Sequence, residues 1–176
     1  MTVRQALAVG LLGFGVGTFA LAGVARRAGL RLNLTSSIPR GLYHVVDQPP
    51  RRESIVLVCL PSAAANLARS RGYIRDGACD DGSSPIGKRI IAMVGDTIQL
   101  VDAGVIVNGR VLSNSAPLPR DSKGRPLPRL RVSRRVVLPN EVWLLSSHPR
   151  GYDSRYYGAV PAARIVARIE PLLTAR

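Results

Sequence analysis

Two residues of this sequence could act together in nucleophilic catalysis. Ser37 lies in the segment 33–43 (NLTSSIPRGLY), and Lys88 lies in the segment 87–96 (GKRIIAMVGD). A serine hydroxyl becomes an effective nucleophile only when a base within hydrogen-bond reach takes its proton. Lysine can be that base when it is neutral, and burial among apolar neighbours lowers its pKa by desolvation. The two segments therefore predict acyl-transfer chemistry, in which the serine attacks a carbonyl and forms an ester.

Two other assignments of the catalytic side chains remain open at this point. Ser36 directly precedes Ser37, and spacing alone does not separate adjacent serines as the nucleophile. A Ser-His-Asp triad of Ser37, His148 and Asp153 has the right residue types. However, His148 lies in a Ser-Ser-His-Pro turn, and a triad would leave Lys88 without a role. The pairing of Ser37 with Lys88 is therefore the preferred interpretation.

A third segment, 152–158 (YDSRYYG), carries Asp153 and Arg155 two positions apart, where they can form an ion pair beneath a loop.

The first two segments also have interpretations that involve no catalysis. Hydroxyl residues before a Pro-x-Gly sequence suit a turn. A lysine in an apolar strand is costly to bury unless it is neutral or paired, so Lys88 needs an explanation in either case.

The elements that must position these residues are short strands. Apolar stretches predict strands at residues 54–60, 89–94, 97–101, 105–107, 110–112, 132–138, 141–146 and 165–173. Asn108-Gly109 predicts a type I′ hairpin turn, because both residues accept positive φ. One short helix is expected at 63–71, and residues 113–131 are expected to form a long surface loop. With 17 Gly and 13 Pro, the chain favours a mainly β domain over a helix bundle.

The N-terminal segment is apolar enough to meet a membrane. Residues 6–25 carry no charge, and Arg26 and Arg27 follow them. About 20 residues in a helix span roughly 30 Å, the thickness of the hydrocarbon core of a bilayer. Residues 1–27 are therefore expected to be a signal peptide or a membrane anchor, with a single domain over residues 28–176.

The formal net charge of +14 suggests an anionic partner. Most of the basic residues are arginines scattered along the whole chain, and the few aromatic residues do not interleave with a basic cluster. Nucleic-acid-binding proteins combine such clusters with aromatic stacking platforms. Nucleic acid is therefore not expected as a partner, whereas a basic surface suits the anionic lipids of a membrane.

Taken together, the three segments resemble the sequence boxes of the serine-lysine signal peptidase family. In that family Ser-Met-x-Pro carries the nucleophile, Lys-Arg before Gly-Asp carries the base, and Asp-Ser-Arg-x-x-Gly closes the site. The sequence SIPRGLY found here is more similar still to the TraF-type conjugal transfer peptidases. The resemblance implies a signal-peptidase-like β-barrel or sheet domain that works without a cofactor or metal.

The resemblance also assigns roles to individual residues. Ser37 matches the nucleophile, and Lys88 matches the general base. Thr35 matches the position whose hydroxyl forms the oxyanion hole together with the Ser37 backbone amide, and Asp153 and Arg155 match a structural ion pair near the site.

The match is incomplete where the lysine would be oriented. Signal peptidases have Gly-Asp-Asn-Arg where this chain has residues 145–148 (LSSH), and their lysine-orienting serine falls at Gly151. If a hydroxyl orients Lys88 in this chain, the candidates are Ser146 and Ser154.

An activity and a location follow from the same resemblance. TraF-type peptidases mature pilin subunits, and some join the trimmed subunit head to tail, so a pilin precursor is the expected substrate. The catalytic domain is expected in the periplasm, attached to the bacterial inner membrane unless the N-terminal segment is cleaved. The arginines after residue 25 favour the opposite orientation, a conflict that a cleaved leader would remove. The alternatives are an ordinary leader peptidase and a non-catalytic, basic assembly factor of a conjugation apparatus.

The two cysteines, Cys59 and Cys79, flank the expected helix. In a cytosolic protein they would be free thiols, but in the oxidising compartment that the resemblance implies they would form a disulfide. That disulfide would pin the segment between them and stabilise the fold by about 3 kcal/mol.

Overall fold

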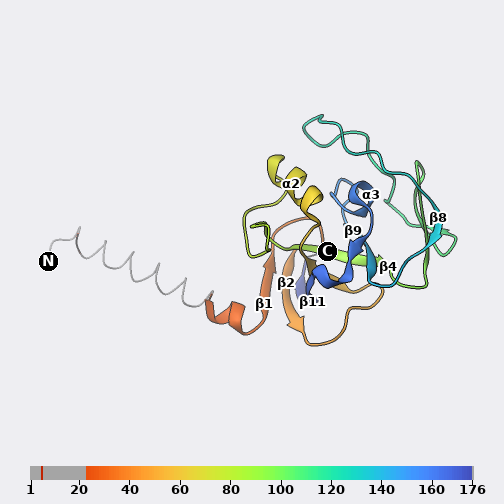
Figure 1. Cartoon of the computed structure of the whole chain (residues 1–176). Helices are drawn as coiled ribbons and strands as arrows, with labels where there is room; N and C mark the ends of the chain where they lie inside the picture. Colours follow the sequence, from red (N-terminus) through yellow and green to blue (C-terminus); the bar gives the residue numbers. More distant parts are fainter. Residues whose placement is uncertain (1–4, 6–22, 176) are drawn as a thin grey trace.

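The computed structural model describes residue 5 and residues 23–175, and its fold is mainly β (Figure 1). One sheet has seven strands in the order β1 (Leu30–Asn33), β2 (Gly41–Val46), β11 (Ile165–Thr174), β3 (Ile55–Val58), β4 (Ile86–Ala92), β9 (Glu141–Leu145) and β10 (Val160–Pro161). A second sheet has four strands in the order β7 (Arg110–Val111), β6 (Gly104–Val107), β5 (Thr97–Val101) and β8 (Val132–Val136). The short helices are α2 (Ser62–Ser70), α3 (Ser154–Tyr157) and the 3₁₀ helix η1 (Ala162–Arg164).

Strand β9 and the second half of β4 are buried on both faces, which explains their nearly continuous apolar sequences. On one face, Ile91 and Trp143 pack against Ile98 of the four-stranded sheet. On the other face, Ile90 and Leu144 belong to a second apolar cluster. A polar side chain on the second half of β4 or on β9 is therefore enclosed in the protein.

The expected fold class is confirmed, and the expected strands are present with small shifts at their ends. Asn108 and Gly109 have φ angles of 50° and 81°, as the hairpin prediction requires. The strand expected at 89–94 begins earlier, at Ile86, so that Lys88 lies inside it. The sequence patterns do not predict β1 and β2. The segment that contains Ser37 and the Pro-x-Gly sequence indicates only a turn, with no strands on either side. In the structure that turn is the loop joining two paired strands.

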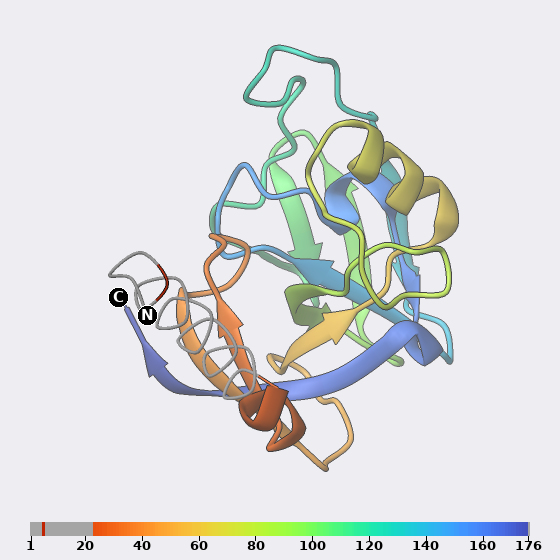
Figure 2. The same cartoon turned by 90° about the vertical axis from the view of Figure 1, so that its left-hand side faces the viewer.

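Strands β1 and β2 lie at one end of the molecule and β8 lies at the other (Figure 1). Strand β11 crosses the molecule, and its last residues pair with β2 (Figure 2). No helix within residue 5 and residues 23–175 is long and apolar enough to cross a membrane. Residues 6–22, the greater part of the expected signal peptide or anchor, lie outside the described residues.

Candidate active site

Strand β4 places Lys88 in the interior of the protein. Its side chain lies on the same face as those of Ile86 and Ile90, because side chains two positions apart on a strand point the same way. Val56 of β3 is paired directly with Lys88, and these three apolar residues belong to one cluster. Lys88 is only 2% exposed. Its surroundings are therefore aliphatic, which disfavours an ammonium ion.

Burial lowers the pKa of Lys88 from its usual 10.5 to about 8. The carboxylate of Asp153 opposes this shift, whereas the guanidinium of Arg155 adds to it. At pH 8 about half of Lys88 is consequently neutral and able to accept a proton, and at pH 7 about a tenth.

Ser146 is the hydrogen-bond partner of Lys88. The Lys88 amino group donates to Ser146 Oγ at 2.5 Å. The register of the antiparallel sheet explains this contact. Ile90 of β4 pairs with Leu144 of β9, so Lys88, two residues before Ile90, lies opposite Ser146, two residues after Leu144. The backbone N–H of Ser146 donates to Asp153 Oδ2 at 2.9 Å. Sheet pairing thus brings together two buried polar residues that are 58 positions apart in the sequence.

The loop between β1 and β2 carries Ser37 to the same region. The next residue, Ile38, is buried, and its side chain contacts Gly87, where an added Cβ would lie 2.7 Å from Ile38 Cδ1. The carbonyl oxygen of Ser37 accepts a hydrogen bond from the Ser147 backbone N–H at 2.8 Å. Within the described residues, no hydrogen bond joins the Ser37 and Lys88 side chains. In enzymes such contacts often tighten only when the substrate binds.

Asn33 organises the loop that carries the serines. Its amide nitrogen donates to the carbonyl oxygens of Thr35, Ile38 and Pro39 at 2.9, 3.1 and 3.0 Å. Its Oδ1 accepts a hydrogen bond from Thr35 Oγ1 at 2.7 Å. The Thr35 side chain is exposed, and its contribution to an oxyanion hole remains a prediction. The sequence signal for Asn33 was an asparagine two positions before a threonine, a common turn arrangement.

The two alternative assignments receive no support from side-chain contacts. Ser36 is exposed, whereas Ser37 is half-buried. His148 is exposed, and its Nδ1 accepts a hydrogen bond from the Arg150 backbone N–H at 3.1 Å. Within the described part of the chain, no hydrogen bond joins His148 to Asp153.

Asp153 and Arg155 form a buried ion pair, as the sequence predicts. Arg155 Nε and Nη2 donate to the two carboxylate oxygens of Asp153 at 2.7 and 2.8 Å, and both side chains are fully buried. The remaining donors of Arg155 reach the carbonyl oxygens of Ala116, Pro149 and Gly151. Since every charge has hydrogen-bond partners, this pair holds the loop after β9 against the long loop between β7 and β8.

The disulfide between Cys59 and Cys79 is present, with a Cα–Cα distance of 5.8 Å. It closes the segment that contains α2. Just beyond α2, the Tyr73 hydroxyl donates to Asp121 Oδ2 at 2.5 Å, and its ring packs on Tyr152 with centroids 5.4 Å apart. The pinned segment therefore contacts both the loop between β7 and β8 and the loop that follows Ser146.

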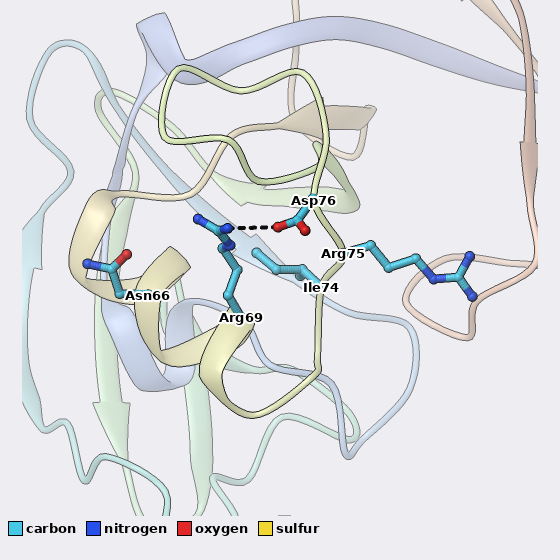
Figure 3. Close-up of a pocket in the computed structure, with 5 residues that line it drawn as sticks. All are labelled: Asn66, Arg69, Ile74, Arg75 and Asp76. Atoms are coloured by element: carbon cyan, nitrogen blue, oxygen red, sulfur yellow. Dashed lines mark hydrogen bonds and ion pairs between the residues drawn. The ribbon is translucent and has the colours of Figure 1, made fainter.

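A surface hollow of about 570 Å³ lies beside α2 (Figure 3). It is lined by Asn66, Arg69, Ile74, Arg75 and Asp76. The ion pair between Arg69 and Asp76 lies across it at 2.7 Å. None of these five residues is a predicted site residue.

Comparison with known proteins identifies a family for most of the chain. Residues 2–173 match the protein family described as "Signal peptidase, peptidase S26". The chain belongs to this family. Among solved structures, a signal peptidase I from Enterococcus faecalis is similar over 69% of this chain and 97% of its own, with 19% identity and a TM-score of 0.38.

Several relatives in this family carry a conjugation name. This signal peptidase family member is 36% identical over 174 residues to "Plasmid transfer protein TraF" of Escherichia coli, covering 98% of both chains. It is 37% identical over 177 residues to "Conjugal transfer protein TraF" of Agrobacterium tumefaciens, covering 99% of this chain and 98% of the relative. It is 38% identical over 170 residues to "Probable conjugal transfer protein TraF" of Sinorhizobium fredii, covering 93% and 89%.

Family membership and the disulfide both indicate the cellular compartment of the domain. Structural disulfides persist in oxidising compartments and are rare in the cytosol. The disulfide between Cys59 and Cys79 and the signal peptidase family therefore both indicate an extracytoplasmic domain.

Proposed function

We propose that this chain is a serine peptidase that matures a pilin precursor, with Ser37 as nucleophile and Lys88 as general base. The observation that carries the proposal is the environment of Lys88, which is buried, has a pKa of about 8 and hydrogen-bonds Ser146. Gly87, which precedes the lysine, contacts Ile38, which follows the serine. The conjugal transfer names of the relatives support a pilin as substrate.

The reaction begins when neutral Lys88 takes the proton of the Ser37 hydroxyl. The Ser37 oxygen attacks the carbonyl carbon of the scissile peptide bond. The Ser37 backbone N–H donates to the resulting oxyanion, and so does the Thr35 hydroxyl after it turns away from Asn33 Oδ1; each such donor contributes about 3 kcal/mol. The carbon–nitrogen bond then breaks, the leaving amine takes the proton from Lys88, and an ester remains on Ser37.

Two nucleophiles can resolve the ester. Water, deprotonated by Lys88, gives a trimmed product, and the proton returns to the Ser37 oxygen. If the amino terminus of the same substrate reaches the ester, its nitrogen replaces the serine oxygen and a cyclic peptide forms. Proximity favours this outcome, because it greatly raises the effective concentration of the amine. Cyclisation belongs to the proposal through the resemblance to TraF-type peptidases.

We also propose that residues 1–27 form a leader or anchor and that residues 28–176 act in the periplasm against the inner membrane. Exposed leucines support this placement. Leu32 and Leu173 both pair with Leu42 across β1, β2 and β11, and both are largely exposed (68% and 75%). This apolar row lies at the end of the molecule opposite β8 (Figure 1), and it adjoins the loop that carries the nucleophile. Arginines before β1 suit anionic headgroups.

Cleavage of the pilin precursor tests the proposal. Ser37→Ala removes the atom that carries the acyl group, so cleavage should fall to background while the fold persists. Lys88→Arg should be equally inactive, because a guanidinium stays protonated at any usable pH. Ser36→Ala is the matched control and should cleave normally.

Other outcomes would favour the alternative functions. If Ser37→Ala still supports conjugation, the chain is a non-catalytic assembly factor. Mass spectrometry of the product separates trimming from cyclisation, because ring closure removes one further water from the mass. A product that is only trimmed, with conjugation normal, identifies an ordinary leader peptidase.

A further inference from the structure

We propose that Ser146 is the positioning residue for Lys88 and that it occupies space that the chain keeps open by having glycine at position 151. This inference rests on the proposed Ser37–Lys88 mechanism. It adds a residue whose hydroxyl directs the lysine, and a steric rule that links positions 146 and 151.

The contacts of Ser146 form a continuous chain of hydrogen bonds to the ion pair. Its hydroxyl accepts from Lys88 Nζ, and its backbone N–H donates to Asp153 Oδ2. Asp153 is in turn held by Arg155 through two charged hydrogen bonds. Because Ser146 is itself buried, its hydroxyl has a fixed position relative to β4.

Lys88 needs such a partner because its other neighbours cannot direct it. A neutral amine has two N–H groups and one lone pair, and only the lone pair accepts the proton of the nucleophile. The cluster around Lys88 on β3, β4 and β9 is aliphatic, and the charged groups that act on it are Asp153 and Arg155. An N–H donated to Ser146 fixes the rotation of the amino group, so that the lone pair is available on another side.

Gly151 explains why the hydroxyl comes from position 146. A Cβ added at Gly151 would lie 2.1 Å from Ser146 Oγ and 2.2 Å from Ser146 Cβ, far below van der Waals contact. The space beside Lys88 therefore holds one side chain, from either position 146 or position 151. Ser154, the other candidate, is used differently: the hydroxyl that Lys88 contacts is that of Ser146, whereas Ser154 Oγ accepts from the Leu144 backbone N–H at 2.9 Å.

The first test is Ser146→Ala, assayed as a function of pH with a fluorogenic peptide that spans the pilin processing site. We expect kcat to fall by roughly 10- to 100-fold, as for other small misplacements of reacting groups, with little change in KM. Loss of an acceptor for the ammonium favours the neutral amine, so the midpoint of the pH–rate profile should move to lower pH.

Ser154→Ala is the matched control, since it removes a buried serine hydroxyl at the start of α3 that, among the described residues, forms no hydrogen bond with Lys88. It should lower the melting temperature but leave the midpoint of the pH–rate profile unchanged. If Ser146→Ala keeps the wild-type kcat and midpoint, the positioning role is wrong. Should Ser37→Ala also remain active, the proposed function fails; if Ser37→Ala is inactive, only this inference fails.

An exchange of the two residues tests the steric rule. Gly151→Ser alone should lower the melting temperature, because its side chain collides with Ser146. Ser146→Gly alone should be as slow as Ser146→Ala. The double variant Ser146→Gly/Gly151→Ser should regain stability over Gly151→Ser and activity over Ser146→Gly. A folded double variant no more active than Ser146→Gly would overturn the rule.

Discussion

Two groups of aspartate–arginine ion pairs lie in opposite environments, one buried and one exposed to water. Asp153 and Arg155 lie fully buried beside Lys88, and their hydrogen bonds hold the loop after β9. Asp102 accepts from Arg129 at 3.1 Å and from Arg131 at 2.6 Å, with all three side chains between 60% and 73% exposed.

The difference shows how burial decides what an ion pair does. Water screens the exposed cluster, so its strength is small and its loss leaves no unsatisfied charge. The buried pair has no water to replace a missing partner, so removing one side leaves an isolated charge in the interior. The buried pair therefore holds the backbone of Ser146, the hydrogen-bond partner of Lys88, whereas the exposed cluster contributes mainly to surface charge.

The largest expected effect comes from breaking the buried pair. Arg155→Ala leaves the Asp153 carboxylate buried without its main partner and should cost about 3–5 kcal/mol of stability. Activity should be lost as well, because Asp153 holds the Ser146 backbone. Denaturant unfolding and the peptide assay would measure the two effects. A loss below about 1 kcal/mol would mean that the pair behaves like an exposed one.

The disulfide closes the segment around α2, and Tyr73 of that segment packs on Tyr152, the residue before Asp153. Replacing both Cys59 and Cys79 by serine releases the segment that contains α2 and should cost about 3 kcal/mol by loop entropy. Denaturant unfolding of the periplasmically expressed protein would measure the change, with the oxidised wild type as reference. Thiol titration of the folded wild type should find no free thiol; two thiols would contradict the bond between them.

Lys88 itself should destabilise the fold, in contrast to the paired charges near it. Its folded pKa of about 8 lies below the 10.5 of an accessible lysine, so the unfolded chain binds the proton more readily. The loss of stability from burying the Lys88 ammonium is present in full below pH 8. The free energy of unfolding should therefore rise with pH from about 8 to 10.5. Lys88→Met should be inactive, more stable at pH 7 by about 1–3 kcal/mol, and free of this rise. Unfolding experiments across that pH range would contradict the assignment if wild type and variant behave alike.

The smallest effect is expected at the exposed cluster. Arg131→Ala removes one of two partners of Asp102 and should cost at most about 1 kcal/mol. That difference should shrink further at 1 M salt, because screening weakens exposed pairs. A larger, salt-independent loss would show that burial is not what separates the two clusters.

Local sequence patterns predict much of the framework. The apolar stretches locate the strands of both sheets except β1, β2 and β10, and Asn108-Gly109 locates a hairpin, because backbone preference and side-chain pattern are properties of neighbouring residues. The short spacing of Asp153 and Arg155 predicts their ion pair for the same reason.

The remaining features depend on contacts between distant segments. The partnership of Lys88 with Ser146 follows from the register of β4 and β9, which sequence patterns do not define. The close approach of Gly151 to Ser146 appears only after the loop has folded back. The organising role of Asn33 likewise depends on the path of the loop between β1 and β2.

Covalent trapping tests the central claim most directly. The protein would be incubated with an activated ester of a pilin-derived peptide and quenched in acid, and the acylated residue would be located by peptide mapping and mass spectrometry. We expect the acyl group on Ser37 in the wild type, no adduct in Ser37→Ala, and a rate of acylation that rises with pH through about 8, the pKa of Lys88. An acyl group on Ser36, or a protein that acquires none, would contradict the account.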